Sequence, residues 1–171
     1  DAQLFYVRGN HDKIVEYSPE CQQRIGPHGG VDLHRKVIRY EGLTLAGVDG
    51  CLRYRPGPYQ YSHTDMWLHV FSLVPKLFVN RLWCGRYLDM FVTHAPAAGI
   101  HDASDVPHQG IKAFRWFIKV FQPTYHFHGH IHIYRPDTVV TTVTGSTTVM
   151  NTYKYRVTEF TLPDQGSRFG R

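Results

Sequence analysis

Three short apolar runs in this chain end in the same way, in a cluster of Asn, His and Gly residues, and this pattern constrains the fold more than any other feature. Leu-Phe-Tyr-Val leads into Gly-Asn-His-Asp at 9–12, Met-Phe-Val into Thr-His-Ala-Pro at 93–96, and Tyr-His-Phe into His-Gly-His-Ile-His at 128–132. Such apolar runs are typical of buried strands. In open α/β sheets the functional crevice lies beyond the carboxyl ends of the strands. We therefore expect the three clusters to converge.

The remainder of the chain predicts both helices and strands. We expect a hairpin of strands 36–40 and 43–48, a helix over 64–83 in which Pro75 can introduce a kink, an amphipathic helix over 110–121, and late strands at 138–143 and 153–162. This order indicates a mixed α/β sheet layered with helices. We expect one domain over residues 1–162 and a flexible polar tail over 163–171.

Composition excludes some classes of protein. The net charge of +5 comes from scattered basic residues, which is compatible with anionic substrates and selects none of them. The apolar stretch 66–83 contains Lys76 and Arg81, which argues against a membrane span, and we expect no membrane partner. The three Cys form no paired framework, which favours a reducing compartment and a cytoplasmic location.

The clusters carry the atoms that metal ions prefer. Imidazole nitrogen and amide oxygen together suit Zn, Mn or Fe, and 12 His in 171 residues is a high count. His130 and His132, two positions apart, can face one side if the chain is locally extended. Each cluster alone also has an ordinary structural explanation, such as an Asx turn at 9–12 or a half-exposed strand at 128–132. The three together favour a metal site.

The clusters resemble the motifs of a known family. Gly-Asn-His-Asp at 9–12, Val-Thr-His-Ala-Pro at 92–96 and Gly-His-Ile-His at 129–132 resemble, in this order, those of the metallophosphoesterases, or calcineurin-like phosphoesterases. The resemblance implies an α/β fold, a layered α-β-β-α sandwich of mixed sheets. It also implies hydrolysis of a phosphate ester by two divalent metal ions (Mn, Fe or Zn), with a metal-activated hydroxide as the nucleophile.

The resemblance implies roles for individual residues. Asn10, His94 and His130 would bind the second metal ion, and His132 would bind the first. Neither ion would have its full set of ligands from these four residues.

Four further residues are candidates near these ligands. The resemblance implies that His11 stabilises charge on the scissile phosphate and protonates the leaving oxygen. Asp12 would fix the geometry of its loop. His101 and Asp102 follow the 93–96 cluster and are candidates for substrate binding, although a solvated loop that caps a helix explains them as well.

Two motifs of the family, GDxH and GDxxD, are absent, because the sequence contains no Gly-Asp dipeptide. They would supply an Asp and a His to the first metal ion and the Asp that bridges both ions. Either the chain is a fragment of the active enzyme, incomplete at its N-terminus, or it is a natural short form that has lost catalysis. We favour the fragment, because the remaining motifs are intact, and expect this chain alone to be inactive.

Three functions are compatible with these residues. The first is a metallophosphoesterase acting on a phosphate-ester substrate. A related nuclease ranks lower and nucleic acid is not an expected partner, because no continuous basic strip with interleaved aromatic residues is present. The third is a catalytically inactive binding or scaffold module on the same fold. The kind of ester, the metal and the oligomeric state stay open.

Overall fold

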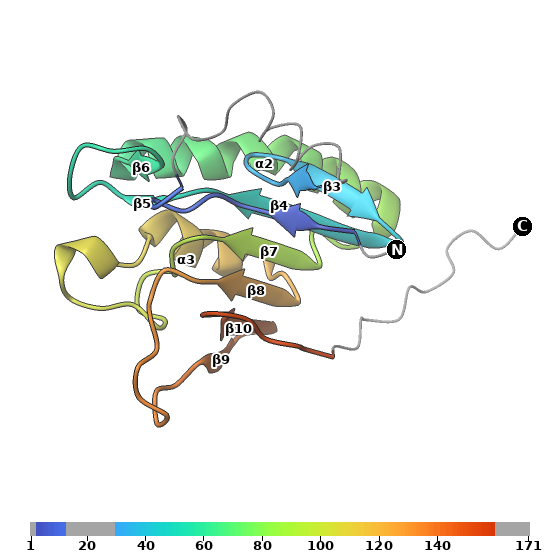
Figure 1. Cartoon of the computed structure of the whole chain (residues 1–171). Coiled ribbons are helices and arrows are strands. Elements are labelled where there is room, and N and C mark those ends of the chain that lie inside the picture. Colours follow the sequence, from blue (N-terminus) through green and yellow to red (C-terminus); the bar gives the residue numbers. More distant parts are fainter. Residues whose placement is uncertain (1–2, 13–29, 160–171) are drawn as a thin grey trace, which may run out of the picture.

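A six-stranded mixed sheet is the central element of the computed structural model, which describes residues 3–12 and 30–159 (Figure 1). The strand order is β3-β4-β7-β8-β10-β9. Strands β4, β7, β8 and β10 are parallel, and β3 and β9 lie antiparallel at the two edges. The elements are β1 (Phe5–Tyr6), β2 (Val31–Asp32), β3 (Val37–Tyr40), β4 (Leu43–Val48), β5 (Cys51–Leu52), β6 (Gln60–Tyr61), α2 (His63–Cys84), β7 (Met90–Thr93), the 3₁₀ helix η2 (Val106–His108), α3 (Lys112–Phe121), β8 (Tyr125–His128), β9 (Thr141–Thr144) and β10 (Thr147–Asn151).

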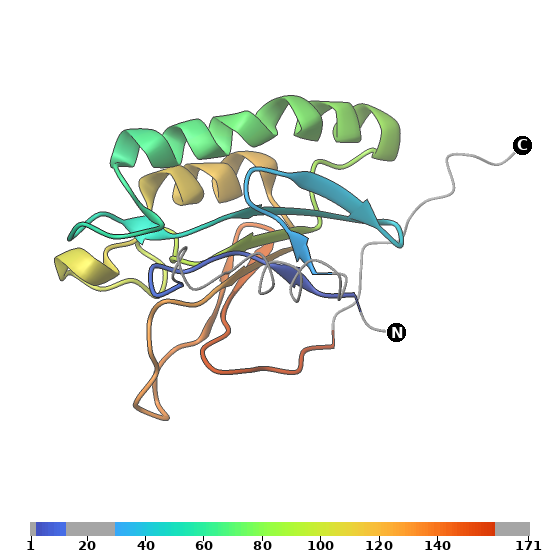
Figure 2. The same cartoon turned by 45° about the horizontal axis from the view of Figure 1, so that its top comes forward.

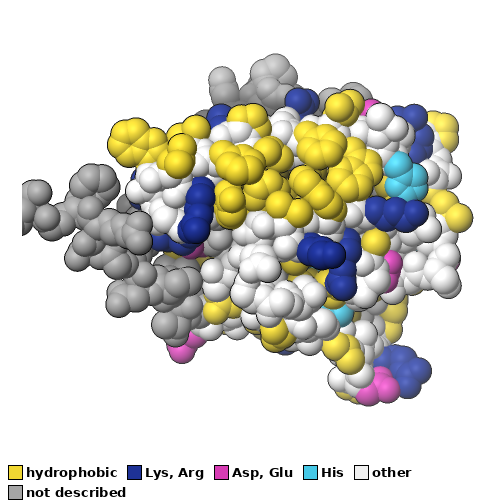
Figure 3. Space-filling model, turned by 180° about the vertical axis from the view of Figure 1, so that it is seen from behind, with side chains coloured by type: hydrophobic (Ala, Val, Ile, Leu, Met, Phe, Trp, Pro, Cys, Tyr) yellow, Lys and Arg dark blue, Asp and Glu magenta, His cyan; other side chains and the backbone are white. Residues whose placement is uncertain are grey.

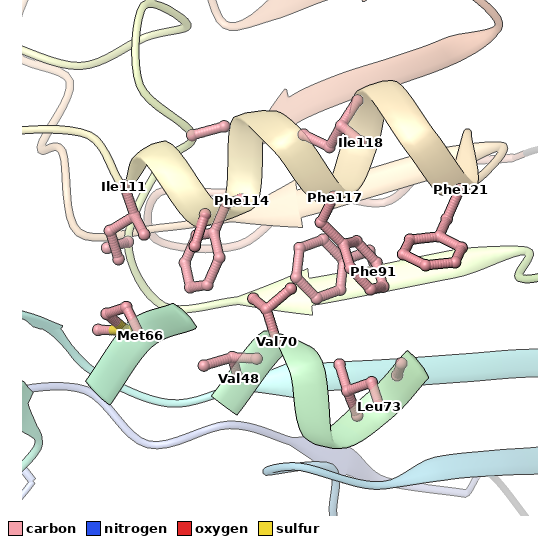
Figure 4. Packing of buried hydrophobic residues seen from close by; sticks show 14 of the residues in the cluster. Val48, Met66, Val70, Leu73, Phe91, Ile111, Phe114, Phe117, Ile118 and Phe121 are labelled. Atoms are coloured by element: carbon pink, nitrogen blue, oxygen red, sulfur yellow. The ribbon is translucent and has the colours of Figure 1, made fainter. Parts of the chain in front are cut away.

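Helices α2 and α3 cover one face of this sheet, and the main core lies between the two layers (Figure 2). Phe91 of β7 is fully buried, and its ring centroid lies 5.5 Å from that of Phe114 and 4.3 Å from that of Phe117 on α3. Val70 and Leu73 of α2 close the cluster from the other side (Figure 4). The layered α/β fold expected from the sequence is confirmed.

Helix α2 begins and ends at clear sequence signals. The Ser62 hydroxyl accepts a hydrogen bond from the Asp65 N–H (3.1 Å) while the Asp65 carboxylate accepts one from the Ser62 N–H (2.9 Å), a capping box. Gly85 ends the helix in the left-handed conformation, with φ of 73°. Pro75 lies inside the helix without ending it. Among the described residues no helix is both long and apolar enough to span a bilayer.

The opposite face of the sheet carries the two-stranded β1–β2 ribbon, which packs on Gly47 of β4. A Cβ atom at Gly47 would lie 2.6 Å from the Leu33 Cβ and 2.8 Å from the Val7 Cγ1, so only glycine allows this approach. The chain that leaves β1 is then anchored at Arg8. Its N–H donates to the Asp49 carboxylate (2.7 Å), and its guanidinium donates to that of Asp32 (2.6 Å).

Most of the helices and strands predicted from the sequence are present, and the prediction of one strand is wrong. The hairpin at β3–β4 and both long helices are confirmed. The strand expected over 153–162 is not formed in its described part, 153–159, where Tyr155 and Val157 are 87% and 88% exposed. The last strand within the described residues is instead β10, because its alternating buried side chains fit between β8 and β9. The expected tail, 163–171, lies outside the described residues.

Candidate metal site

Three loops that follow β1, β7 and β8 meet at one point. The Nε2 atom of His94 lies 2.8 Å from the Oδ1 atom of Asn10 and 3.1 Å from the Nδ1 atom of His130. These three side chains line a pocket of about 270 Å³, together with His11 and His132. The structure therefore brings three of the expected ligands, Asn10, His94 and His130, into contact. It places the fourth, His132, and the expected acid catalyst, His11, in the wall of the same pocket.

The 9–12 loop is shaped by Gly9 and Asp12. The Asp12 carboxylate accepts a hydrogen bond from the Gly9 N–H (2.7 Å), and the Asp12 N–H donates to the Gly9 carbonyl (3.1 Å), which closes a tight turn. A Cβ atom at Gly9 would lie only 2.5 Å from the Cε1 atom of His94. The missing side chain of Gly9 thus leaves the space that the His94 ring fills.

Neighbouring groups orient the atoms that meet. The amide nitrogen of Asn10 donates to the Tyr54 hydroxyl (3.0 Å), which leaves its Oδ1 facing His94. The Pro107 carbonyl, 2.7 Å from His130 Nε2, can only accept, so His130 carries its proton on Nε2 and its Nδ1 is an acceptor. The His94 Nε2 proton therefore lies between two acceptor atoms. A metal ion in place of that proton would face the lone pairs of His94 Nε2, Asn10 Oδ1 and His130 Nδ1.

The electrostatics favour the neutral forms of both imidazoles. Burial, followed by the neighbouring His130, lowers the pKa of His94 to about 3. Burial also lowers the pKa of His130, against the hydrogen bond to Pro107 that raises it. Neutral imidazole is the form that binds metal ions. Two such nitrogens and one amide oxygen suit a divalent transition-metal ion.

His132 lies apart from this group. It is exposed, its Nδ1 lies 3.0 Å from the Tyr134 hydroxyl, and its ring stacks on Tyr153 at 4.7 Å. The condition under which His130 and His132 would face one side, a locally extended chain, is not met, because His130 has a φ of 65°, in the left-handed region. No three His, Cys, Asp or Glu residues within 3–12 and 30–159 form a group that could hold a metal ion. The other side chain in contact with His94, beside His130, is the amide of Asn10.

His101 and Asp102 are not brought to the same pocket. They line a second pocket of about 420 Å³. The His101 Nδ1 lies 3.0 Å from His128 Nε2, and the Asp102 carboxylate accepts hydrogen bonds from the N–H groups of Gly99 and Gly110. These contacts stabilise the loop after β7. A role of the two residues in substrate binding stays a prediction.

Sequence reasoning missed several residues of the first pocket, and three of them contact its predicted ligands or add a charge to it. Tyr54 orients Asn10, Pro107 orients His130, and Lys154 places a cationic side chain in the pocket wall. Each is far in sequence from the motif it supports and belongs to a segment without a motif of its own. A single sequence therefore offers no signal for their role.

Solved structures share this fold. TT1561 of Thermus thermophilus matches with a TM-score of 0.56 at 16% identity, over 87% of this chain and 62% of that one. A second crystal structure matches with a TM-score of 0.58 at 20% identity, over 87% of this chain and 56% of the other. Identities this low support the fold alone. This chain spans less than two thirds of the length of either protein.

The sequence itself matches a family profile. No curated protein matches the chain. The profile of the calcineurin-like phosphoesterases, however, matches residues 2–134, well over half of its length. This range includes the three loops that meet in the pocket. The chain therefore belongs to the calcineurin-like phosphoesterase family.

Proposed function

We propose that this pocket binds divalent metal ions and serves the hydrolysis of a phosphate ester. Family membership indicates metal-dependent phosphoester hydrolysis. The observation that supports this pocket as the site is the His94 Nε2 atom, 2.8 Å from Asn10 Oδ1 and 3.1 Å from His130 Nδ1. We assign one ion to these three residues and assign His132 to a second ion.

The donor atoms fit one transition-metal ion. Two ligand atoms at right angles around an ion lie about 3 Å apart when each bond is about 2.1 Å long. Both measured separations from His94 Nε2 are close to this value. The Tyr54 and Pro107 contacts already hold the ligands in the required orientation, as outer partners do in metal sites. Mn, Fe and Zn all suit this donor set.

The rest of the pocket supplies the groups that act on the ester. A pair of bound ions would polarise the phosphoryl oxygens and lower the pKa of water. His11 is exposed in the pocket wall and, in our proposal, donates a proton to the leaving oxygen. Asp12 holds the turn that presents His11. Lys154 adds a positive charge that attracts the phosphate group.

A catalytically inactive binding module is the second candidate. One observation favours it: among the described residues no three His, Cys, Asp or Glu side chains form a group that could hold a metal ion, and of the pocket residues we assign only His132 to a second ion. A single ion can hold a phosphate group without hydrolysing it. The two candidates share the ion on His94 and differ in turnover.

Metal analysis tests the proposed site directly. The purified chain is loaded with Mn²⁺ or Zn²⁺, desalted and analysed for metal per chain. We expect about one retained ion, and none for His94→Gln, because the central ligand is lost. His63→Gln is the matched control, since His63 is exposed at the start of α2. Equal retention by the wild type and His94→Gln would refute the site.

Hydrolysis by this chain would exclude the inactive binding module. The loaded chain is assayed with p-nitrophenyl phosphate and with bis-p-nitrophenyl phosphate. Hydrolysis that falls about 100-fold or more in His11→Asn, with metal content unchanged, supports the enzyme and the role of His11. Retained metal with no hydrolysis of either ester by the wild type would show that this chain alone is inactive, which is expected both for a fragment of the enzyme and for the binding module.

A further inference from the structure

The outer face of α2 exposes a row of large apolar side chains. Six of them are between 48% and 84% exposed: Leu68, Phe71, Phe78, Val79, Leu82 and Trp83. Each of them lies three, four or seven residues from another member of the row, so they share one side of the helix. Figure 3 shows this side as a broad apolar band. We call it, with the adjoining surface of α3, the outer helical face.

The inner side of α2 is apolar as well. Met66, Val70, Leu73 and Leu77 are fully buried against the sheet and α3. A helix that is apolar on both sides normally has an apolar environment on both sides. The described residues supply an apolar environment only for the inner side of α2. The outer helical face is therefore suited to a second contact.

Aromatic residues join the two helices on this face. The ring centroids of Trp67, Phe71 and Trp116 lie 5.4–5.5 Å apart. Val120, one turn beyond Trp116 on α3, is 45% exposed. The third Trp of the chain, Trp83, lies at the end of α2. All three Trp residues thus belong to the outer helical face.

Almost all the charged residues on the two helices are basic. The sequence contains no Asp or Glu between residues 66 and 88 or between 110 and 122. Five exposed basic residues lie on the two helices: Lys76, Arg81, Lys112, Arg115 and Lys119. Figure 3 shows dark blue side chains around the apolar band. The one acidic residue of the two helices, Asp65, caps the start of α2.

We propose that the outer helical face binds the surface of an anionic lipid bilayer. Exposed Trp, Phe and Leu side chains would enter the interface between headgroups and acyl chains, while Lys and Arg contact the anionic headgroups. A second copy of the chain fits this face less well, because a symmetric contact would bring two sets of basic residues together.

This proposal is compatible with the absence of a spanning helix among the described residues. Our expectation of no membrane partner rested on the absence of a membrane span, and a helix that lies in the plane of the interface needs none. The candidate metal site lies on other elements, the loops after β1, β7 and β8. The proposal is therefore independent of the proposed function.

Vesicle binding tests the proposal without any activity assay. The chain is mixed with vesicles of equal parts phosphatidylcholine and phosphatidylserine, or of phosphatidylcholine alone, and sedimented. We expect binding to the anionic vesicles, weakened by high salt, with a blue shift of Trp fluorescence. Leu82→Ser with Trp83→Ser should lower the partition coefficient at least about tenfold, because two exposed apolar anchors are lost.

A matched control distinguishes vesicle binding through this face from nonspecific adsorption of the protein. Tyr155 and Val157 are 87% and 88% exposed and lie outside the helices, so Tyr155→Ser with Val157→Ser should bind as the wild type does. Wild-type chain that stays in the supernatant with both vesicle types would overturn the proposal. It would also be overturned by a dimer, seen in sedimentation velocity, that Leu82→Ser with Trp83→Ser converts to monomer without any vesicle binding.

Discussion

Replacing Gly9 by Ala should distort the candidate metal site while leaving the fold intact. The new Cβ atom would lie 2.5 Å from the Cε1 atom of His94 and 2.8 Å from its Nδ1. Carbon atoms in packed interiors are about 3.5–4.0 Å apart. The His94 ring must therefore move by about 1 Å, which breaks its approach to Asn10 and His130.

The expected magnitudes follow from this clash. Overpacking of this kind costs roughly 1–3 kcal/mol, and each kcal/mol lowers Tm by about 2–4 °C in a domain of this size. Metal affinity should fall by about 10–100-fold, as it does when a partner that orients a ligand is lost. Thermal unfolding measures the first effect. Titration with Co²⁺, followed by its visible absorption, measures the second.

Gly129 offers a matched control in the same pocket. A Cβ atom at Gly129 would have the His94 carbonyl oxygen as its nearest neighbour, at 3.9 Å, an ordinary contact. Gly129→Ala should therefore keep the affinity for Co²⁺ within about threefold of the wild type. Unchanged binding by Gly9→Ala, or an equal loss in both variants, would refute the argument that the space at Gly9 positions His94.

Three further predictions concern stability. Phe91→Ala should lower the free energy of unfolding by about 3–5 kcal/mol in urea titrations, because the ring is fully buried between the sheet and α3. Asn80→Ala should cost about 2 kcal/mol in the same assay, because the buried Asn80 amide donates to the Thr44 hydroxyl (3.0 Å) and the Tyr87 carbonyl (2.9 Å). His126 is fully buried, and burial holds its pKa well below the ordinary value. As the pH falls, the unfolded chain therefore binds a proton at His126 before the folded chain does. The contribution of His126 to the free energy of unfolding is fully present above about pH 6.5, and it falls by about 1.4 kcal/mol per pH unit below that value. In His126→Phe this pH-dependent contribution should be absent. The prediction would be contradicted if the free energy of unfolding had the same pH dependence in the wild type and the variant.

The sequence alone predicted the parts of this protein that depend on local patterns. Apolar runs indicated the strands that precede the three clusters, and the helical spacing of apolar residues predicted α2 and α3 within a few residues. The motifs at 9–12, 92–96 and 129–132, through the family resemblance that they carry, predicted that Asn10, His94 and His130 share one site, and the three side chains are in contact. Their role as metal ligands stays a prediction. These inferences succeed because a strand or a motif is encoded by neighbouring residues.

The tertiary structure decided what depends on residues far apart in the chain. The space for His94 comes from Gly9, the orientation of Asn10 from Tyr54, and that of His130 from Pro107. The place of β10 between β8 and β9 was also decided by packing, because its burial depends on both neighbours. The apolar pattern of α2 marks core and surface residues alike, and only the packing of the sheet shows which side of the helix is left exposed.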